Sequence, residues 1–338
     1  MSNAKLDRRG FLAGAAGLTG VALAVGAWKP VFAMEDGLHD DITAGHSNFK
    51  IGQIALTLNG ATTAGSLLEA EGGAAFTDVN IQEGGGIYVQ KIPGRLKWQV
   101  INLKRGITAD TQFNTWIRDS LGGKPTSLNG SITGADENFK VFTQTDFFNA
   151  LITEVGFPAL DAASKDAAKM TIKIQPESTR TAAGSGKVQR FKFVNGWPSK
   201  LSIGNFKLTI GGMNTDSVTG VDAITVKLNY AAGDAKAGPR LVSIDAENVK
   251  IRIPEAKAHD FVSWHQDFVI NGNNSPENEK HGSLSLLGPD LKTEFFRLDF
   301  SGLGIFALDA DPLTLSGDTV RHVTAQLYCD KVIYNFKL

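Results

Sequence analysis

Apolar and polar residues alternate along most of the chain beyond the first fifty residues. A period of two places every second side chain on the same face of an extended segment, which is typical of half-buried strands. The pattern therefore predicts a mainly β fold, a sandwich or a barrel. The cleanest alternating runs are Phe191/Phe193, Phe206/Leu208/Ile210 and Ile224/Val226/Leu228/Tyr230.

A hairpin followed by a short helix is predicted between residues 87 and 123. Residues 87–91 and 96–104 read as its two strands. Between them, Pro93 fixes φ and Gly94 accepts a positive φ, which suits a type II turn. Helical spacing of apolar residues follows, with Thr108 as the expected cap and Gly122-Gly123 as the end. The apolar residues of this helix are Phe113, Trp116, Ile117 and Leu121.

Residues 121–169 are predicted to be a helical insertion. A first helix is expected over 145–155, because Phe148, Leu151, Ile152 and Val155 fall on one side of a helix. A second, alanine-rich helix is expected over 158–168. The insertion would interrupt the β domain, whose strands resume at Met170.

The small, polar segment 231–239 (AAGDAKAGP) is predicted to link two modules. The expected organisation is a leader at 1–33, a β domain at 34–231 and a second β module at 240–338. The second module is a degenerate copy of the first if two weak matches are real. Residues 191–197 resemble 296–302, and 216–223 resemble 318–325, at nearly the same shift along the chain. Chance similarity between amphipathic strands is the alternative.

The first 33 residues have the pattern of a twin-arginine export signal. Arg8 and Arg9 precede Phe11 and Leu12, and an uncharged apolar run continues to residue 28. A small-x-small cleavage motif follows at 31–33. We expect the Tat translocase to export the chain to the periplasm or the cell exterior, with no stable membrane anchor afterwards. A leader retained as an anchor is the alternative.

Composition and charge exclude some partners. The 338 residues include 34 Lys+Arg and 35 Asp+Glu, a net charge of −1, and residues 1–33 hold four basic residues against one acidic. A chain without its leader is therefore more acidic, and no nucleic-acid partner is expected. Cys329 is the single cysteine, expected to be a small buried residue on a strand rather than an intermolecular disulfide.

The sequence lacks an evident catalytic or metal-binding motif. His259 and His265 lie six residues apart, which does not fit the spacing of a zinc-binding helix. The oxygen-rich segment 271–279 lacks the pattern of a calcium loop. We expect no catalytic site, no metal and no cofactor, and an enzyme that uses the region from His259 to Asp267 is a minor alternative.

Five elements in order resemble the core signature of the bacteriophage tail-tube protein family. An acidic-Gly-Gly run precedes a Lys-apolar-Pro-Gly run, an apolar-x-Leu-Lys-Arg-Gly run and a helix with tryptophan. A later Phe-Val-Asn-Gly-Trp-Pro run completes the set. The resemblance covers 50–120 and 170–231, and its residues include Glu83, Gly84, Gly85, Lys91, Pro93, Gly94, Trp98, Lys104, Arg105, Gly106, Trp116 and Trp197.

The resemblance implies a small β-sandwich or barrel with one flanking helix, assembled into hexameric rings that stack as a tube. Extended hairpins would pair with neighbouring copies. The cations near the hairpin would then form either a solvated face or charge pairs with the next subunit. A contact with DNA is a weaker third option. These cations are Lys91, Arg95, Lys97, Lys104 and Arg105.

Three features depart from the family: the length of the chain, the extra segment 121–169 and the leader. Together they predict a structural subunit that self-assembles into rings, tubes or filaments outside the inner membrane. One alternative is a conventional phage or injection-system tube protein. Another is a secreted monomeric β-sandwich binding module, with Trp264 and Tyr88 as candidate contact residues.

Overall fold

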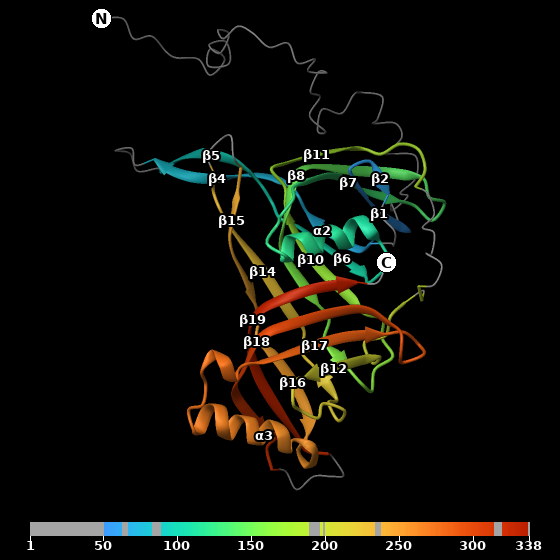
Figure 1. Ribbon diagram of the computed structural model, residues 1–338. Coiled ribbons are helices and arrows are strands. Elements are labelled where there is room, and N and C mark those ends of the chain that lie inside the picture. The colour runs from blue at the N-terminus through green and yellow to red at the C-terminus, as the bar shows by residue number, and fades with distance from the viewer. Residues whose placement is uncertain are drawn as a thin grey trace, which may run out of the picture. The chain divides into compact units, whose positions relative to one another are not determined.

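The computed structural model describes residues 51–62, 67–82, 89–188, 197–198, 200–233, 238–313 and 320–336. Residues Phe49–Leu338 form one compact unit. It is built mainly from strands, so the predicted β class is confirmed (Figure 1). No helix among the described residues is long and apolar enough to cross a membrane.

The first sheet has the strand order β2-β1-β7-β8-β10-β6-β3. Strands β11 and β14 also pair with β8, and β15 pairs with β14. The bounds are β1 Gln53–Leu58, β2 Ala61–Thr62, β3 Leu67–Gly72, β6 Ile101–Gly106, β7 Leu128–Ala135, β8 Val141–Phe157, β10 Lys169–Gln175, β11 Ser178–Ala183, β14 Ile224–Ala231 and β15 Arg240–Ala246.

The second sheet has the order β12-β17-β18-β19-β16-β13-β9. A separate two-stranded ribbon is formed by β4 and β5. The bounds are β4 Ala75–Gln82, β5 Gln90–Trp98, β9 Leu160–Asp161, β12 Phe206–Ile210, β13 Gly220–Val221, β16 Val249–Pro254, β17 Lys280–Leu287, β18 Glu294–Ala310 and β19 His322–Phe336.

Helix α2 (Thr111–Leu121) confirms the predicted helix. The expected apolar residues Phe113, Trp116, Ile117 and Leu121 are buried along its inner side. Its N-cap is Asp110 rather than Thr108, because the Asp110 carboxylate accepts the hydrogen bond from the Phe113 backbone N–H at 3.1 Å. Gly122 forms the C-cap and Gly123 follows with a φ of 79°.

A second helix, α3 (His259–His265), continues as a π-type turn at η3 (Gln266–Ile270). Its buried residues are Phe261, Trp264 and Phe268. Short 3₁₀ turns flank this helix at η2 (Glu255–Lys257) and η4 (Pro276–Asn278).

The predicted helix over 145–155 is wrong, because these residues lie in the long strand β8. The buried residues of β8 include Phe147, Ala150, Ile152 and Val155, so their spacing is three, two and three. Two irregularities cause this spacing. Asn149 has a φ of 48°, and a bulge interrupts the pairing with β10 between Ile152 and Glu154. A bulged strand therefore imitates the period of a helix.

The predicted helix over 158–168 is also wrong. This segment contains the short strand β9, turns, and an isolated bridge between Ala167 and Ser202. Residues 121–169 are therefore not a helical insertion. They supply the central strand β8 of the first sheet.

The predicted turn at Pro93-Gly94 is wrong as well. Strand β5 runs through both residues and pairs with β4, whereas β6 pairs with β3 and β10. Proline is tolerated here because β5 has a partner on one side only. Strand β4 ends at Gln82 and β5 begins at Gln90, and residues 83–88, which include Glu83, Gly84 and Gly85, lie outside the described residues.

The predicted module boundary at 231–240 falls inside a hairpin. Strands β14 and β15 flank it and pair with each other, from Val226 opposite Ala246 to Ala231 opposite Arg240. The second sheet also includes β12 and β13, which precede the boundary. Segment 231–239 is therefore a connection within one sheet rather than a linker between separate modules.

The second sheet repeats the topology of the first. The order β1-β7-β8-β10-β6-β3 matches the order β12-β17-β18-β19-β16-β13. Each series carries a hairpin (β4–β5 or β14–β15) before its β6 or β16 strand and a helix (α2 or α3) after it. We call residues 53–183 the first repeat and residues 206–336 the second repeat.

The two repeats agree in the details of pairing. On β8 and β10, Gly156 pairs with Thr171, and on β18 and β19, Asp309 pairs with Thr324. The sequence shift from β8 to β18 is therefore the same as the shift from β10 to β19. The bulges fall at corresponding positions of these two pairs of strands. Within the helices, Phe113 and Trp116 correspond to Phe261 and Trp264, which have the same spacing and are also buried.

The repeat register expected from the sequence is therefore wrong. Residues 191–196 of the first expected match lie outside the described residues. In the second match, Val221 of 216–223 and Ala325 of 318–325 both pair with Ile251, from opposite sides of β16. The two segments are neighbours in one sheet instead of equivalents.

The hairpin of the second repeat leaves its own sheet and completes the sheet of the first. Strand β14 pairs with β8 from Ile224 opposite Phe157 to Lys227 opposite Glu154 (Figure 1). The Tyr230 hydroxyl also donates to the Ile152 carbonyl at 3.0 Å. Backbone hydrogen bonds thus join the two repeats within the chain.

A buried cation holds the start of α2. The Arg105 guanidinium is 2% exposed and lies 4.2 Å from the centre of the Phe113 ring. Its Nη2 donates to Thr108 at 2.6 Å, and its Nη1 is 3.5 Å from the Asp110 carboxylate. Burial lowers the pKa of Arg105, and the Asp110 carboxylate opposes that shift.

The same cluster reaches β19. The Tyr334 hydroxyl donates to Asn114 Oδ1 at 2.9 Å, although the two residues are 220 positions apart. Asn114 Nδ2 in turn donates to the Thr108 carbonyl at 2.8 Å. Burial raises the pKa of Tyr334, while the charge of Arg105 lowers it. The cluster therefore fixes the N-terminal turn of α2 against both repeats.

Replacing Arg105 by alanine is expected to lower the free energy of unfolding by about 3 kcal/mol, because the Asp110 carboxylate is left buried without its cation. Lys104→Ala is the matched control on the same strand. Its ammonium is 3.8 Å from Glu69 and both side chains are exposed, so the change should stay within about 0.5 kcal/mol. Urea unfolding followed by circular dichroism measures both, and equal losses would contradict the role of Arg105.

Alkaline pH is expected to destabilise the fold through Tyr230. Burial raises the pKa of its hydroxyl from about 10 to about 12. Below pH 10 both states keep the proton, and between pH 10 and 12 the unfolded chain loses it first, so the free energy of unfolding falls. Tyr230→Phe should make this decline shallower in urea titrations at stepped pH. An unchanged slope would show that Tyr230 does not contribute.

Candidate assembly surface

The β4–β5 ribbon is paired only with itself among the described residues. Its register places Thr77 opposite Leu96, Val79 opposite Pro93 and Ile81 opposite Lys91. Between the first two pairs, β5 carries one more residue than β4, which is a bulge. Among the described residues, no further strand pairs with the outer edge of either β4 or β5.

One face of the ribbon is apolar and exposed. Val79 is 63% exposed, Ile81 66% and Leu96 56%. Alternation along β4 places Val79 and Ile81 on one side, and the register adds Leu96 and Pro93 to the same side, together with Lys91 opposite Ile81 at its edge. A contiguous exposed apolar surface of this kind marks an interaction site in a soluble protein.

The opposite face of the ribbon is mixed, because it carries the exposed Phe76 and Ile92 beside polar side chains. It carries Asp78 and Asn80, and the Lys97 ammonium bonds the Asp78 carboxylate. Gly94 lies at the bulge, where a Cβ atom would approach the Asp78 carbonyl oxygen to 3.1 Å. The glycine therefore allows the two strands to stay close where the register shifts.

The five predicted cations do not form one exposed cluster. Lys91, Arg95 and Lys97 are exposed on β5, and the Lys104 side chain is exposed on β6 with its ammonium near Glu69. Arg105 is buried in the cluster described above, so the expectation that it belongs to a surface group was wrong. Its place in the sequence signature reflects folding rather than contact with a partner.

The remaining signature residues lie close to the first repeat's core. The Trp116 indole N–H donates to the Thr126 carbonyl at 2.8 Å and closes the loop after α2. Trp98 ends β5 opposite Ala75, and its carbonyl accepts from Gln175 at 3.1 Å. Gly106 pairs with Lys169 at the end of β6. These residues position the ribbon on the sheet.

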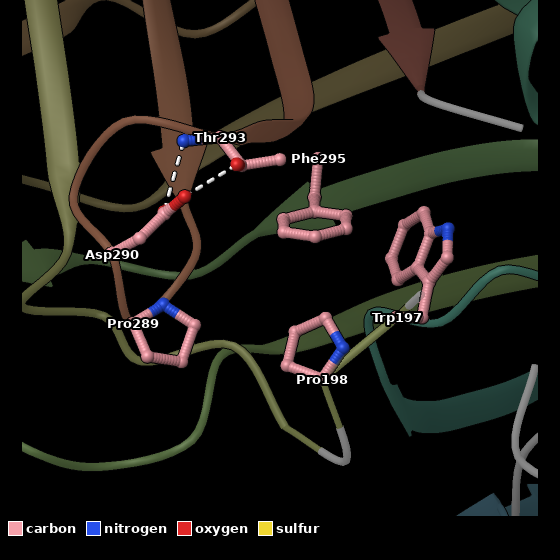
Figure 2. Close-up of a pocket in the computed structure, with 6 residues that line it drawn as sticks. All are labelled: Trp197, Pro198, Pro289, Asp290, Thr293 and Phe295. Carbon is pink, nitrogen blue, oxygen red and sulfur yellow. Dashed lines mark hydrogen bonds between the residues drawn. The ribbon is translucent and has the colours of Figure 1, made fainter. Parts of the chain in front are cut away.

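Trp197 lies apart from the other signature residues, in a shallow pocket of about 350 Å³ (Figure 2). Its ring centre is 5.0 Å from that of Phe295. The Thr293 backbone N–H donates to Asp290 at 2.9 Å, and the Thr293 hydroxyl also bonds this carboxylate. These bonds hold the pKa of Asp290 at about 2. The pocket lining is Trp197, Pro198, Pro289, Asp290, Thr293 and Phe295.

In the region from His259 to Asp267, both aspartate side chains accept hydrogen bonds from neighbouring loops. Asp260 accepts a hydrogen bond from the Asn214 backbone N–H at 2.7 Å. Asp267 accepts one from the Asn273 side chain at 2.6 Å. Within the part of the chain that the structure describes, no three His, Cys, Asp or Glu residues form a group that could hold a metal ion.

Further exposed apolar residues lie on the second repeat. On the helix formed by α3 and η3, Val262 is 48% exposed and Val269 37%. On β18, Phe306 is 41% exposed. None of these residues, nor Val79 and Ile81, was predicted to be a surface contact. The alternation of Thr77, Val79 and Ile81 with polar residues was the signal available for the ribbon.

Residues 50–180 match the family model described as T4-like virus tail tube protein gp19. The matched residues nearly coincide with the first repeat. A search of curated proteins gives no match. Solved structures resemble parts of the chain at low identity.

One similar chain comes from the sheath-tube complex of the PVC extracellular contractile injection system, with a TM-score of 0.37 and 17% identity over 43% of this chain and 97% of that chain. Another, from the anti-feeding prophage cap, has a TM-score of 0.37 and 19% identity over 42% and 95%. Hcp1 from Flavobacterium johnsoniae has a TM-score of 0.29 and 14% identity over 40% and 99%. Residues 50–180 of the chain are therefore similar to the T4-like virus tail tube proteins.

Proposed function

We propose that this chain is a structural subunit that assembles with further copies of itself into rings, tubes or filaments. The observation that carries the proposal is the exposed apolar face of the β4–β5 ribbon, formed by Val79, Ile81 and Leu96. The match of residues 50–180 to tail tube proteins supports the same conclusion. We assign no catalytic role to the chain.

A two-stranded ribbon is marginal in water unless something covers its apolar face. Exposed strand edges also recruit further strands, so soluble proteins usually cover or shorten them. The ribbon has both features, an apolar face and open edges. A second copy of the chain would remove both from water, which makes self-association favourable.

The duplication changes the expected subunit count. Hexameric rings were expected from the family resemblance, one module per subunit. Because each chain carries two repeats of one topology, three chains supply six of them. We infer that a ring would contain three chains, and threefold averages in electron microscopy would distinguish this from six chains.

The place of assembly follows from the leader. We propose that Arg8, Arg9, Phe11 and Leu12 direct the chain to the Tat translocase, and that it assembles in the periplasm or outside the cell. These residues lie outside the described part of the structure. Twin-arginine export carries folded proteins, so a chain without disulfides is suited to it.

A binding module is the second candidate function. The open Trp197 pocket favours it, because aromatic and proline rings present a flat apolar surface to a ligand. Trp264, an expected contact residue, is only 7% exposed and packs in the core, while Tyr88 lies outside the described residues. A strictly monomeric protein at high concentration would favour this function over assembly.

Val79→Asp is expected to reduce assembly at least tenfold, because it places a charge on the apolar face that a second copy would cover. Asn80→Asp is the matched control, since it adds the same charge to the next residue on the opposite face of β4. Light scattering and negative-stain electron microscopy of the purified proteins compare them. Equal assembly of both variants would exclude this face, and a monomeric wild-type chain would contradict the proposed function.

The double variant Arg8→Lys and Arg9→Lys is expected to retain the chain in the cytoplasm, because the translocase reads the arginine pair rather than the charge alone. Lys5→Arg, which also exchanges one cation for another, should leave export unchanged. Cell fractionation with immunoblotting measures the distribution. Normal export of the double variant would remove the proposed route without affecting the assembly test.

A further inference from the structure

We propose that β4 of one copy pairs with β18 of a second copy, in the register that β14 takes on β8 inside one chain. This inference rests on the proposed function and specifies its contact surface. It follows from the duplication, which gives every contact between the first and second repeats a counterpart between successive copies.

The model for this contact is the pairing of β14 with the C-terminal end of β8 within one chain. Strand β7 pairs with β8 only as far as Ala150, opposite Leu128. Beyond this point, β14 joins β8 on the side that β7 leaves open, because β10 and β11 occupy the other side. The pairing places Val226 opposite Val155. A hairpin from the second repeat thus extends the sheet of the first.

Strand β18 has the same opening without an occupant. Strand β17 pairs with it only as far as Leu303, opposite Lys280. Beyond Leu303, β18 stays paired with β19 on one side as far as Ala310. On its other side, this stretch of β18 has no strand partner among the described residues. Phe306, which interrupts the pairing with β19, lies in this open stretch and is 41% exposed.

The equivalent hairpin is the β4–β5 ribbon. Ala75 pairs with Trp98 as Val226 pairs with Ala246, and both hairpins end shortly before the next strand of their repeat. The bulges also agree, because Val79 opposite Pro93 corresponds to Tyr230 opposite Leu241. Ala75 is therefore the counterpart of Val226.

These equivalences give a register for the contact between copies. On β8, Val155 pairs with Ile172 of β10 and directly precedes Gly156, which pairs with Thr171. On β18, Leu308 pairs with Ala325 of β19 and directly precedes Asp309, which pairs with Thr324. Leu308 is therefore the counterpart of Val155. Ala75 of one copy then lies opposite Leu308 of the next. The backbone groups of both open edges become paired in this arrangement.

Burial within the chain shows what the contact would cover. In the second repeat's hairpin, Val226 and Leu228 are at most 3% exposed. Their counterparts in the first repeat, Ala75 and Thr77, are exposed. The half-buried Tyr230, whose hydroxyl reaches β8, corresponds to Val79, which is 63% exposed. The ribbon therefore lacks the covering surface that its equivalent already has.

The same relation accounts for the exposed apolar side of α3. Within the chain, β19 covers α2 through Tyr334, and both Asn114 and Leu121 are at most 3% exposed. Their counterparts on the second helix are Val262 and Val269, which are 48% and 37% exposed. A following copy placed by this relation would bring its β11 against this helix, since β11 corresponds to the end of β19.

Two surfaces that were unexplained separately thus follow from one relation between repeats. The contact joins different surfaces of the two copies, so a row of copies always keeps one free ribbon at one end and one open β18 edge at the other. Such a contact closes into a ring when its rotation returns to the start, and otherwise extends as a filament. Because the ribbon and the open β18 edge match each other through this relation, we infer that a second copy of the chain occupies both.

Disulfide trapping between two single-cysteine chains tests the register. Both carry Cys329→Ser. One also carries Ala75→Cys and the other Leu308→Cys. Mixed and oxidised, they should give a dimer on a non-reducing gel, because facing residues of paired strands lie within disulfide reach. Neither chain alone should give it. The matched control replaces Ala75→Cys by Phe76→Cys, which points to the opposite face and should cross-link at least tenfold less.

The outcomes separate the contact from the function. Selective cross-linking of the 75–308 pair supports the proposed register. Equal cross-linking of both pairs, or none in preparations that contain rings or filaments, overturns the register and leaves the proposed function intact. Light scattering of the same mixtures before oxidation reports assembly. If every preparation is monomeric, both the contact and the proposed function are wrong.

Discussion

The need of every strand to pair its backbone groups governs this structure. The β14–β15 hairpin meets that need outside its own repeat, where β14 completes the open side of β8. This exchange makes the two repeats one compact unit rather than two domains on a tether. Among the described residues, the same need is unmet at the outer edge of β4 and at the end of β18, and the proposed assembly follows from that difference.

A polar cluster strengthens the junction between repeats. Arg105 and Asp110 hold the start of α2, and Asn114 extends the cluster to Tyr334 on β19. Burying a guanidinium is costly unless its donors are satisfied, and the nearby Phe113 ring adds a further contact. The position corresponding to Arg105 in the second repeat is Ile253, so the repeats share topology without sharing this cluster.

The sequence allowed the mainly β class and helix α2 to be predicted, because Phe113, Trp116 and Leu121 keep a regular period. It misled at β8, where Asn149 and a bulge turn strand alternation into helix-like spacing. Pro93-Gly94 has the chemistry of a turn, yet it lies in an edge strand where proline loses no ladder bond. Local residue preferences cannot reveal which strand of the other repeat a hairpin joins.

The sequence suggested a duplication but placed it at the wrong shift, because no single shift aligns the two repeats. Phe113 and Trp116 recur 148 positions later, whereas Asp146, Phe147 and Thr171 recur 153 positions later. The repeats are instead related by pairing register, by bulges, and by lengths between elements. The ribbon was missed for another reason. Its alternation resembles that of any half-buried strand, and only the fold reveals that no covering layer faces Val79 and Ile81.

Joining two divergent copies in one polypeptide has a consequence for how the surfaces can evolve. In an oligomer of identical single modules, a substitution alters every position at once. Here Arg105 and Ile253 occupy matching places, so neighbouring places can acquire different charges, loops or attachments independently. An assembly of such chains would carry two alternating sets of features around its circumference, encoded by one gene.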